Sequence, residues 1–300
     1  MNCKHCNSGN LQKRGMRNNK QRYLCLDCGG WGSYPEVSLE TKGAKILVYD
    51  IETSLMKAWI FRPKTEYIRY DMIEEDTIIL TWSAKWLGED DVMSSTLTPK
   101  EAKSRDDKRV TKEFYELLNQ ADVVVAHNGD NFDIRHMNAK FFEHGFPPPL
   151  PFRSVDTLKV AKKYFKGGFP SLALNYLTKK LKVSGKIETK VQLWKDCGYG
   201  DKQALDDMSR YCDNDVIILE DFYVLMLPWI SNHPPVGMYS REKNAMSCPN
   251  CNGKIEIVEG KIYSTKANAW KTYRCSECGN TGRTKISALT KDERALFIAR

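Results

Sequence analysis

The chain has 300 residues, 41% of them hydrophobic and 28% charged, and a formal net charge of +8 at pH 7. This length can bury a sizeable core in one large domain or two. The sequence has no run near the roughly 18 apolar residues that a membrane span needs. Its N-terminus also lacks the apolar core of a signal peptide. We therefore expect a cytoplasmic protein with no membrane partner.

Four cysteines near the N-terminus form two close pairs. Cys3 and Cys6 are followed, after 18 residues, by Cys25 and Cys28. The cytosol keeps thiols reduced, and two Cys-x2-Cys pairs supply the four thiolates of a tetrahedral structural zinc site. We therefore predict a zinc ribbon over residues 1–43. Unrelated buried or disulfide-bonded cysteines are the alternative.

The central region alternates apolar strands with helical patterns, which indicates an α/β domain. Apolar runs at 46–49 and 122–126 are nearly continuous, as is typical of strands at the centre of a sheet. A third strand is expected at 77–82, and segment 232–237 reads as a linker towards the C-terminal end. Helical periodicity predicts four helices, at 110–121, 134–145, 171–181 and, the longest, 201–226.

Two carboxylates follow the first apolar strand, in the segment KILVYDIETS. Side chains alternate between the faces of a strand, so Asp50 and Glu52 point the same way while Ile51 points into the core. Like charges side by side on one face repel each other. Hard divalent cations neutralise clustered acids, so this pair predicts a metal site.

Two later segments supply further acids at strand or helix ends. AHNGDNFD follows the strand at 122–126 and ends in Asp133, where a helix is expected to begin. YCDND lies inside the longest helix and places Tyr211 and Asp215 four residues apart on one face. Two metal ions held by such acids can bind a phosphodiester, activate water and stabilise the leaving oxygen.

In the order DIET, HNGDNFD and YCDND, these segments resemble the three motifs of the DEDD 3′→5′ exonucleases of the RNase H-like superfamily. The tyrosine four residues before the last aspartate is typical of the tyrosine subclass. The resemblance implies a mixed five-stranded sheet flanked by helices, in a domain that we place at 44–232. This region looks most like stand-alone exonuclease domains of phages and bacteria.

The resemblance also implies a role for each matching residue. It implies that Tyr211 orients or deprotonates the attacking water, and that Thr53 approaches the scissile end. Asn128 and Phe132 match positions that contact the terminal nucleotide. Two Mg²⁺ or Mn²⁺ ions are expected to bind Asp50, Glu52, Asp133 and Asp215.

Several neighbouring residues compete for these roles. Asp206, Asp207 and Asp213 are alternative helical ligands, but Asp213 is expected to face away and to be exposed. Asp156 is expected to cap a helix. His127 and His136 flank the second motif, His5 could replace one thiolate in the first ribbon, and Cys197 and Cys212 are expected to serve packing.

A second set of cysteines lies near the C-terminus. Cys248 and Cys251 are followed, after 23 residues, by Cys275 and Cys278. The pattern predicts a second structural Zn²⁺ site, in a small β-rich ribbon over residues 240–300.

The positive charge lies at the two ends of the chain. Residues 1–45 carry 8 Lys and Arg against 3 Asp and Glu, and residues 241–300 carry 12 against 6, whereas the middle is net negative. Basic segments interleaved with aromatic residues are typical of nucleic-acid binding, although a solubilising surface is the alternative. The aromatic residues in question are Tyr23, Trp31, Trp270 and Tyr273.

These patterns together predict a metal-dependent 3′→5′ exonuclease that acts on DNA, preferably single-stranded, and grips it with zinc ribbons. An exoribonuclease of the same fold is one alternative. A zinc-ribbon nucleic-acid-binding protein with a non-cleaving domain is another. DNA is expected as partner more than RNA, and a role in replication or repair would require partner proteins.

Overall fold

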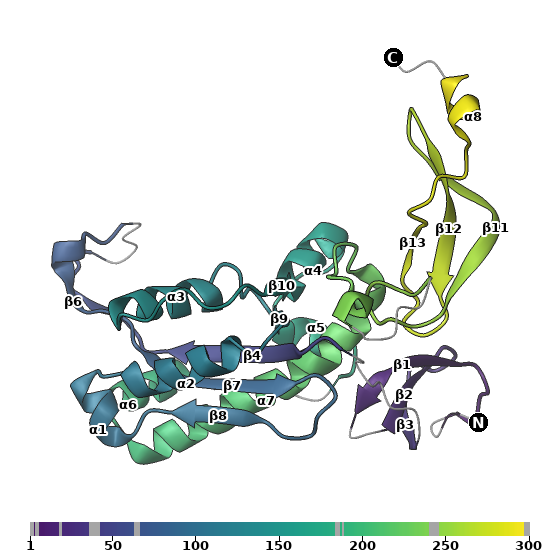
Figure 1. Cartoon of the computed structure of the whole chain (residues 1–300). Helices are drawn as coiled ribbons and strands as arrows, with labels where there is room; N and C mark the ends of the chain where they lie inside the picture. The colour runs from purple at the N-terminus through teal and green to yellow at the C-terminus, as the bar shows by residue number, and fades with distance from the viewer. Residues whose placement is uncertain are drawn as a thin grey trace. The chain divides into compact units, whose positions relative to one another are not determined.

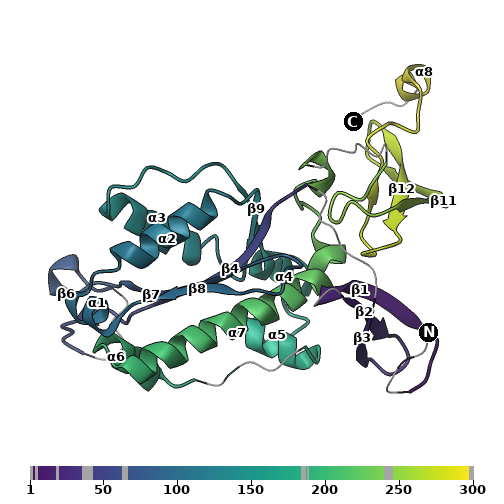
Figure 2. The same cartoon turned by 60° about the horizontal axis from the view of Figure 1, so that its bottom comes forward.

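The computed structural model describes residues 3, 6–17, 20–35, 43–62, 67–183, 187, 189–239 and 246–296. The chain divides into two compact units, which Figures 1 and 2 show as ribbons. One unit is Lys45–Phe222, and the other combines Met1–Ala44 with Tyr223–Arg300. Within the described part of the chain, no helix has the length and apolar character required to cross a membrane.

The unit Lys45–Phe222 is built on a mixed five-stranded sheet with the order β10-β9-β4-β7-β8. The central strand β4 runs parallel to β9 and antiparallel to β7, and β10 is parallel to β9. The prediction of a mixed five-stranded sheet is thereby confirmed. The strands are β4 (Ile46–Thr53), β7 (Ile79–Trp86), β8 (Met93–Thr96), β9 (Val123–Ala126) and β10 (Arg153–Asp156).

Strand β7 is longer than its apolar run predicts. The expected strand ends at Trp82, but β7 continues to Trp86 because residues 83–86 pair with the first half of β4. Ser83 and Lys85 are buried there although both are polar. Their burial is tolerated because Ser83 donates a hydrogen bond to Asp213 and Lys85 forms an ion pair with Glu220.

Helices cover both faces of the sheet, with α2 and α3 on one face and α7 on the other, as Figure 2 shows. The four predicted helices correspond to α2, α3, α5 and α7, whereas α1 and α6 were not predicted and α4 was implied only by the cap expected at Asp156. The helices are α1 (Pro99–Ser104), α2 (Lys108–Leu118), α3 (Asp133–Glu143), α4 (Thr157–Phe165), α5 (Leu174–Lys180), α6 (Val191–Gly198) and α7 (Lys202–Met226).

The main core lies between the sheet and α2. Phe114 of α2 contacts Tyr49 of β4 and Trp82 of β7, with ring centroids 5.3 and 5.6 Å apart. Ile51 belongs to the same buried cluster. Because Tyr49 and Ile51 face α2, the alternating positions of β4 face α7, and these positions carry Asp50 and Glu52.

A short hairpin follows β4, formed by β5 (Lys57–Ala58) and β6 (Ile73–Glu75) with the 3-10 turn η1 (Tyr70–Met72). Ion pairs hold its base, because Glu75 contacts both Lys57, at 2.6 Å, and Arg105, at 2.8 Å.

The second unit contains two three-stranded antiparallel sheets, one near each end of the chain. This unit also contains the short 3-10 helices η2 (Leu227–Trp229) and η3 (Val236–Tyr239) and the helix α8 (Lys291–Ala295). The first sheet comprises β1 (Leu11–Arg17), β2 (Lys20–Cys25) and β3 (Trp31–Pro35), and the second β11 (Ile255–Ser264), β12 (Ala269–Cys275) and β13 (Thr281–Arg283).

Segment 232–237, which we expected to be a linker, is packed within the second unit. His233 and Val236 are both 5% exposed. His233 Nε2 lies 2.5 Å from Tyr223 Oη, and burial lowers the pKa of this imidazole to about 4. The Val236 amide donates to the Pro249 carbonyl at 3.0 Å. Two consecutive prolines suggested an open linker, but the flanking side chains find buried partners.

Candidate functional site

Three acidic side chains gather between β4 and α7. Carboxylate oxygens of Asp50, Glu52 and Asp215 all lie within 4.8 Å of one another. The strand supplies the first two from alternate positions, and the long helix supplies the third. Asp50 and Glu52 are half-buried and Asp215 is 4% exposed. Burial and proximity together concentrate negative charge, which is unfavourable unless a cation neutralises it.

The donor set of this cluster suits magnesium or manganese. All of its ligand atoms are carboxylate oxygens, which hard divalent cations prefer. Within the described residues, the cluster contains neither a thiol nor an imidazole. The residues present therefore fit a hard divalent cation such as Mg²⁺ or Mn²⁺.

Asp133, the fourth predicted ligand, lies beside the cluster but is not one of its three members. It is the first residue of α3 and is 2% exposed, and its Oδ1 accepts a hydrogen bond from the Ile51 amide at 3.2 Å. Burial raises the pKa of this carboxyl to about 7, and the Ile51 hydrogen bond partly opposes the shift. Asp133 is thus held against the backbone between Asp50 and Glu52.

Tyr211 lies one helical turn before Asp215 on α7 and is 7% exposed. Trp194 of α6 packs edge-on against it, with ring centroids 5.8 Å apart and an interplanar angle of 75°. The same indole donates a hydrogen bond from Nε1 to Glu52 Oε2 at 3.1 Å. Trp194 therefore contacts both a candidate ligand and the candidate tyrosine.

Sequence reasoning missed Trp194. Helix α6 is short and was not predicted, so the only available signal was a single tryptophan in the segment VQLWKDCG. No spacing rule connects this tryptophan to residues 52 and 211, because α6 reaches them only through the tertiary fold.

Two further α7 residues contact the strands that carry the site. Cys212 is buried, and its Sγ lies 3.4 Å from the Asp50 carbonyl oxygen and 3.8 Å from Asp50 Oδ2. Burial, with Asp50 next in importance, raises the pKa of this thiol well above its usual value. The expectation that Asp213 is exposed is wrong: it is half-buried, because Ser83 of β7 lies beneath α7 and donates to its Oδ1 at 2.6 Å.

The loop after β9 has a constrained backbone. Asn128 adopts a left-handed conformation with φ of 77°, and its amide donates to Asp156 Oδ1 at 3.0 Å. At Gly129, a Cβ would lie 2.5 Å from the Cβ of Ala126, so the tight turn requires glycine. Phe132 at the end of this loop is 36% exposed, with its ring centroid 4.3 Å from that of His136.

Three further residues named in the sequence analysis lie near the site: Asp156, Thr53 and His127. Asp156 caps α4 by accepting hydrogen bonds from the amides of residues 158 and 159, which confirms the expected cap. Thr53, the last residue of β4, is half-buried. The ring nitrogens of His127 lie 2.9 Å from Thr157 Oγ1 and 3.0 Å from the Leu172 carbonyl oxygen. Both nitrogens thus hydrogen-bond to neighbouring segments of the fold.

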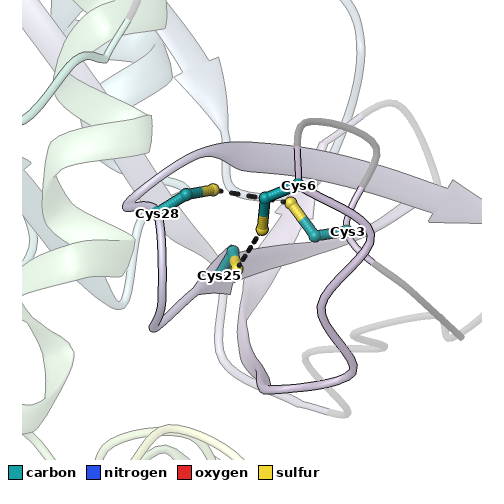
Figure 3. Close-up of side chains that lie close together, drawn as sticks. All are labelled: Cys3, Cys6, Cys25 and Cys28. Atoms are coloured by element: carbon teal, nitrogen blue, oxygen red, sulfur yellow. Dashed lines mark hydrogen bonds between the residues drawn. The ribbon is translucent and has the colours of Figure 1, made fainter.

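The N-terminal cysteines form a compact cluster of four sulfur atoms (Figure 3). Sγ atoms of Cys3 and Cys28 are 3.7 Å apart, and those of Cys6 and Cys25 are 3.5 Å apart. Four sulfurs at about 2.3 Å from a central zinc ion would lie about 3.8 Å from one another. The cluster therefore fits a tetrahedral zinc site. His5 lies outside the described residues.

The C-terminal cysteines repeat this geometry. Sγ atoms of Cys248 and Cys278 are 3.7 Å apart, and those of Cys251 and Cys275 are 3.6 Å apart. Both four-cysteine clusters thus fit zinc ribbons, one in each of the two three-stranded sheets.

One backbone turn recurs in all four Cys-x2-Cys segments. The amide of the first cysteine donates to the carbonyl five residues later, and its own carbonyl accepts from the amide four residues later. The residue after the second cysteine always has positive φ, which Gly and Asn adopt most readily. These residues are Asn7, Gly29, Asn252 and Gly279.

Two of the four aromatic residues expected to bind bases are buried. Tyr23 and Tyr273 are 9% and 8% exposed, so the expectation of stacking is wrong for both. Tyr273 packs inward, where its hydroxyl donates to Asn280 Oδ1 at 3.4 Å. The side chain of Trp31 lies outside the described residues. Trp270 is half-buried.

Comparison with known proteins supports this reading of the fold. The model of the RNase_H superfamily matches residues 73–227, and because this is more than half of the chain, the chain belongs to the RNase_H superfamily. The match begins after β4, so Asp50 and Glu52 lie outside it. No curated protein matches the chain.

Among solved structures, the chain is similar to the family B DNA polymerase from the hyperthermophilic archaeon Pyrobaculum calidifontis. The TM-score is 0.47 and the sequence identity is 14%, over 76% of this chain and 29% of the polymerase chain. The chain thus spans less than a third of that polymerase.

Proposed function

We propose that the protein is a 3′→5′ exonuclease that removes nucleotides from the 3′ end of DNA, preferably single-stranded. The superfamily supports nuclease activity. The observation that carries the finer proposal is the gathering of Asp50, Glu52 and Asp215 within 4.8 Å, with Tyr211 one turn from Asp215. At these four residues the chain resembles the tyrosine subclass of DEDD exonucleases.

In this proposal, the acids of β4 and α7, with Asp133 beside them, hold two Mg²⁺ or Mn²⁺ ions. When bound, the ions supply charge neutralisation at the phosphate and lower the pKa of water. Tyr211 orients the attacking water or, with the help of the nearby cations, deprotonates it; without such help a tyrosine is a poor base at neutral pH. Trp194, which contacts both Glu52 and Tyr211, would help to fix the orientation of each.

The loop after β9 would receive the terminal nucleotide. Phe132 offers a partly exposed ring at the start of α3, and Asn128 presents a fixed backbone in the same loop. Thr53 ends the strand that carries Asp50 and Glu52, which places it next to the reacting phosphate in this proposal.

The three-domain division predicted above is retained as part of the proposal, with the nuclease domain at 44–232 between ribbons at 1–43 and 240–300. Each ribbon would hold one structural Zn²⁺ ion and help to bind nucleic acid. A role in replication or repair in the cytoplasm would require further proteins.

Digestion of matched DNA and RNA strands labelled at the 5′ end tests the proposal. With Mg²⁺, we expect a ladder of products shortened from the 3′ end, faster for DNA, and no products when EDTA is present. Preferential loss of RNA would indicate an exoribonuclease. If both strands remain intact in Mg²⁺ and Mn²⁺ while binding is retained, the chain is a binding protein instead.

A further inference from the structure

The second ribbon carries two aromatic rings and a guanidinium group side by side. Tyr263 on β11 lies directly opposite Trp270 on β12, with ring centroids 6.1 Å apart. The guanidinium carbon of Arg283, at the end of β13, lies 3.9 Å from the centroid of the Trp270 ring and 5.7 Å from that of Tyr263. We name Tyr263, Trp270 and Arg283 the ribbon cluster.

The register of the strands explains why these side chains share one face. Residues directly opposite each other in antiparallel strands point to the same face, as do residues two apart on one strand. Arg283 pairs with the residue two positions after Trp270. The other face carries Tyr273, which is buried over Gly282, where a Cβ would lie 2.6 Å from the tyrosine hydroxyl. One face is therefore closed, and the cluster lies on the open one.

Two of the three residues of the cluster are well exposed to solvent. Tyr263 is 50% exposed and Arg283 is exposed. Among the residues that the structure describes, Arg283 forms no hydrogen bond or ion pair, so its N–H donors are available to a ligand. Arg274 is exposed on the same face, and its cross-strand partner Glu256 is an acidic residue beside it.

We infer that the ribbon cluster binds single-stranded nucleic acid. Aromatic faces stack on bases of any sequence, and a guanidinium group contributes both a planar surface and donors for phosphate oxygens. The excess of 12 basic over 6 acidic residues in 241–300 complements a polyanion. The choice of ligand rests on the proposed function, because a nuclease must hold its strand while the end is processed.

Binding of a fluorescein-labelled oligo-dT strand to the full-length protein tests the inference, by anisotropy at several salt concentrations and without Mg²⁺, so that the strand is not cut. Trp270→Ala should raise Kd about tenfold, the size of one lost base-stacking contact. Arg283→Ala should also make the slope of log Kd against log salt shallower by about 0.7, the share of one phosphate contact.

Two variants separate stacking from charge. Arg283→Lys keeps the charge but removes the planar group, so Kd should rise while the salt slope is unchanged. Lys291→Ala, on α8 outside the cluster, removes one positive charge and serves as the matched control, with little effect expected on either quantity. Against an abasic strand, Trp270→Ala should have no effect, because the base that stacks is missing.

The outcome that overturns the inference is equal Kd and equal salt slope for the wild type, Trp270→Ala and Arg283→Lys. In a competition experiment, an acidic polypeptide that displaces the labelled strand as effectively as unlabelled oligo-dT would also overturn the inference. The face would then bind polyanions or acidic proteins in general. The same titration with oligo-rU shows whether the ribbon cluster prefers ribose or deoxyribose. If Trp270→Ala does not fold, as judged by thermal unfolding, Arg283→Lys alone decides.

The same proteins are assayed for digestion with Mg²⁺ in parallel. If the cluster variants bind weakly and neither they nor the wild type digest any strand, the proposed nuclease activity is contradicted. The inference about the ribbon cluster then still stands. If the cluster variants digest a saturating concentration of DNA at the normal rate and their Kd is unchanged, the inference about the ribbon cluster is contradicted. The proposed nuclease activity then still stands.

Discussion

Trp194 connects two residues that the sequence places in different motifs. Its indole N–H donates to Glu52 and its ring contacts Tyr211 edge-on. Glu52 comes from β4 and Tyr211 from α7, so a side chain from a third element contacts both. Such contacts matter because metal ligands must be held at defined angles by their neighbours.

We expect Trp194→Phe to weaken Mg²⁺ binding about tenfold, because the ring against Tyr211 is kept while the donor to Glu52 is lost. Outer-shell partners of metal ligands typically contribute about 10- to 100-fold to affinity or activity. Calorimetric titration with Mg²⁺ measures the effect, and Trp86→Phe, at a half-buried tryptophan of β7, is the control. Unchanged Mg²⁺ affinity would show that the hydrogen bond to Glu52 has no such role.

Asp50→Ala should abolish cleavage while leaving the thermal unfolding temperature close to that of the wild type. Asp50 lies within 4.8 Å of two other acids, so its removal takes away a ligand but also relieves repulsion. Digestion rate and thermal unfolding measure the two effects. The control is Asp206→Ala on the exposed side of α7, where Asp206 forms an ion pair with Lys202. A near-normal rate for Asp50→Ala in Mg²⁺ would contradict the metal assignment.

Tyr211→Phe should lower the rate by about 10²-fold or more, the usual contribution of an acid–base group. The variant keeps the ring packed against Trp194, so Mg²⁺ affinity should not change. Single-turnover digestion and Mg²⁺ titration distinguish these effects. An unchanged rate would make Tyr211 a packing residue.

At the scale of the element, the junction of α3 with β4 makes stability depend on pH. The carboxyl of Asp133 has a pKa of about 7 when folded, because of burial, against about 3.9 in an unfolded chain. Between these values the folded state binds the extra proton, so stability falls as pH rises from about 4 to about 7.

Urea unfolding of the protein without divalent metal should therefore have a lower midpoint at pH 8 than at pH 5. Asp133→Asn removes the titrating group but keeps an oxygen that can accept from the Ile51 amide, so its midpoint should fall less over the same range. Parallel curves for the two proteins would show that Asp133 does not cause the dependence.

Local sequence determined some elements and not others. The strand β4 and helix α7 were predictable because apolar periodicity and the acids coincide on them. Trp194, the burial of Tyr273 and the half-buried Asp213 were not, since each depends on a partner distant in sequence: α6 against β4, β12 against β13, and β7 beneath α7. Spacing within one element gives the face of a side chain, but not what lies opposite that face.

At the scale of the whole molecule, two small sheets depend on metal. Neither three-stranded ribbon has a large core, so metal binding and folding should be coupled. Elemental analysis should find two zinc ions per purified chain, one fewer in Cys6→Ser and one fewer in Cys278→Ser. A chain without zinc, with its thiols in disulfides, would contradict this prediction.

The turn repeated at all four cysteine pairs also has a consequence for the order in which the two ribbons assemble. Each turn closes over a few residues and can form alone, so the slow event is the meeting of two turns across the intervening loop. The loops have 18 and 23 residues, and the entropy of closure grows only with the logarithm of length. The difference is about 0.2 kcal/mol. Metal capture at the two ends should therefore proceed at nearly the same rate, and neither ribbon has a kinetic lead over the other.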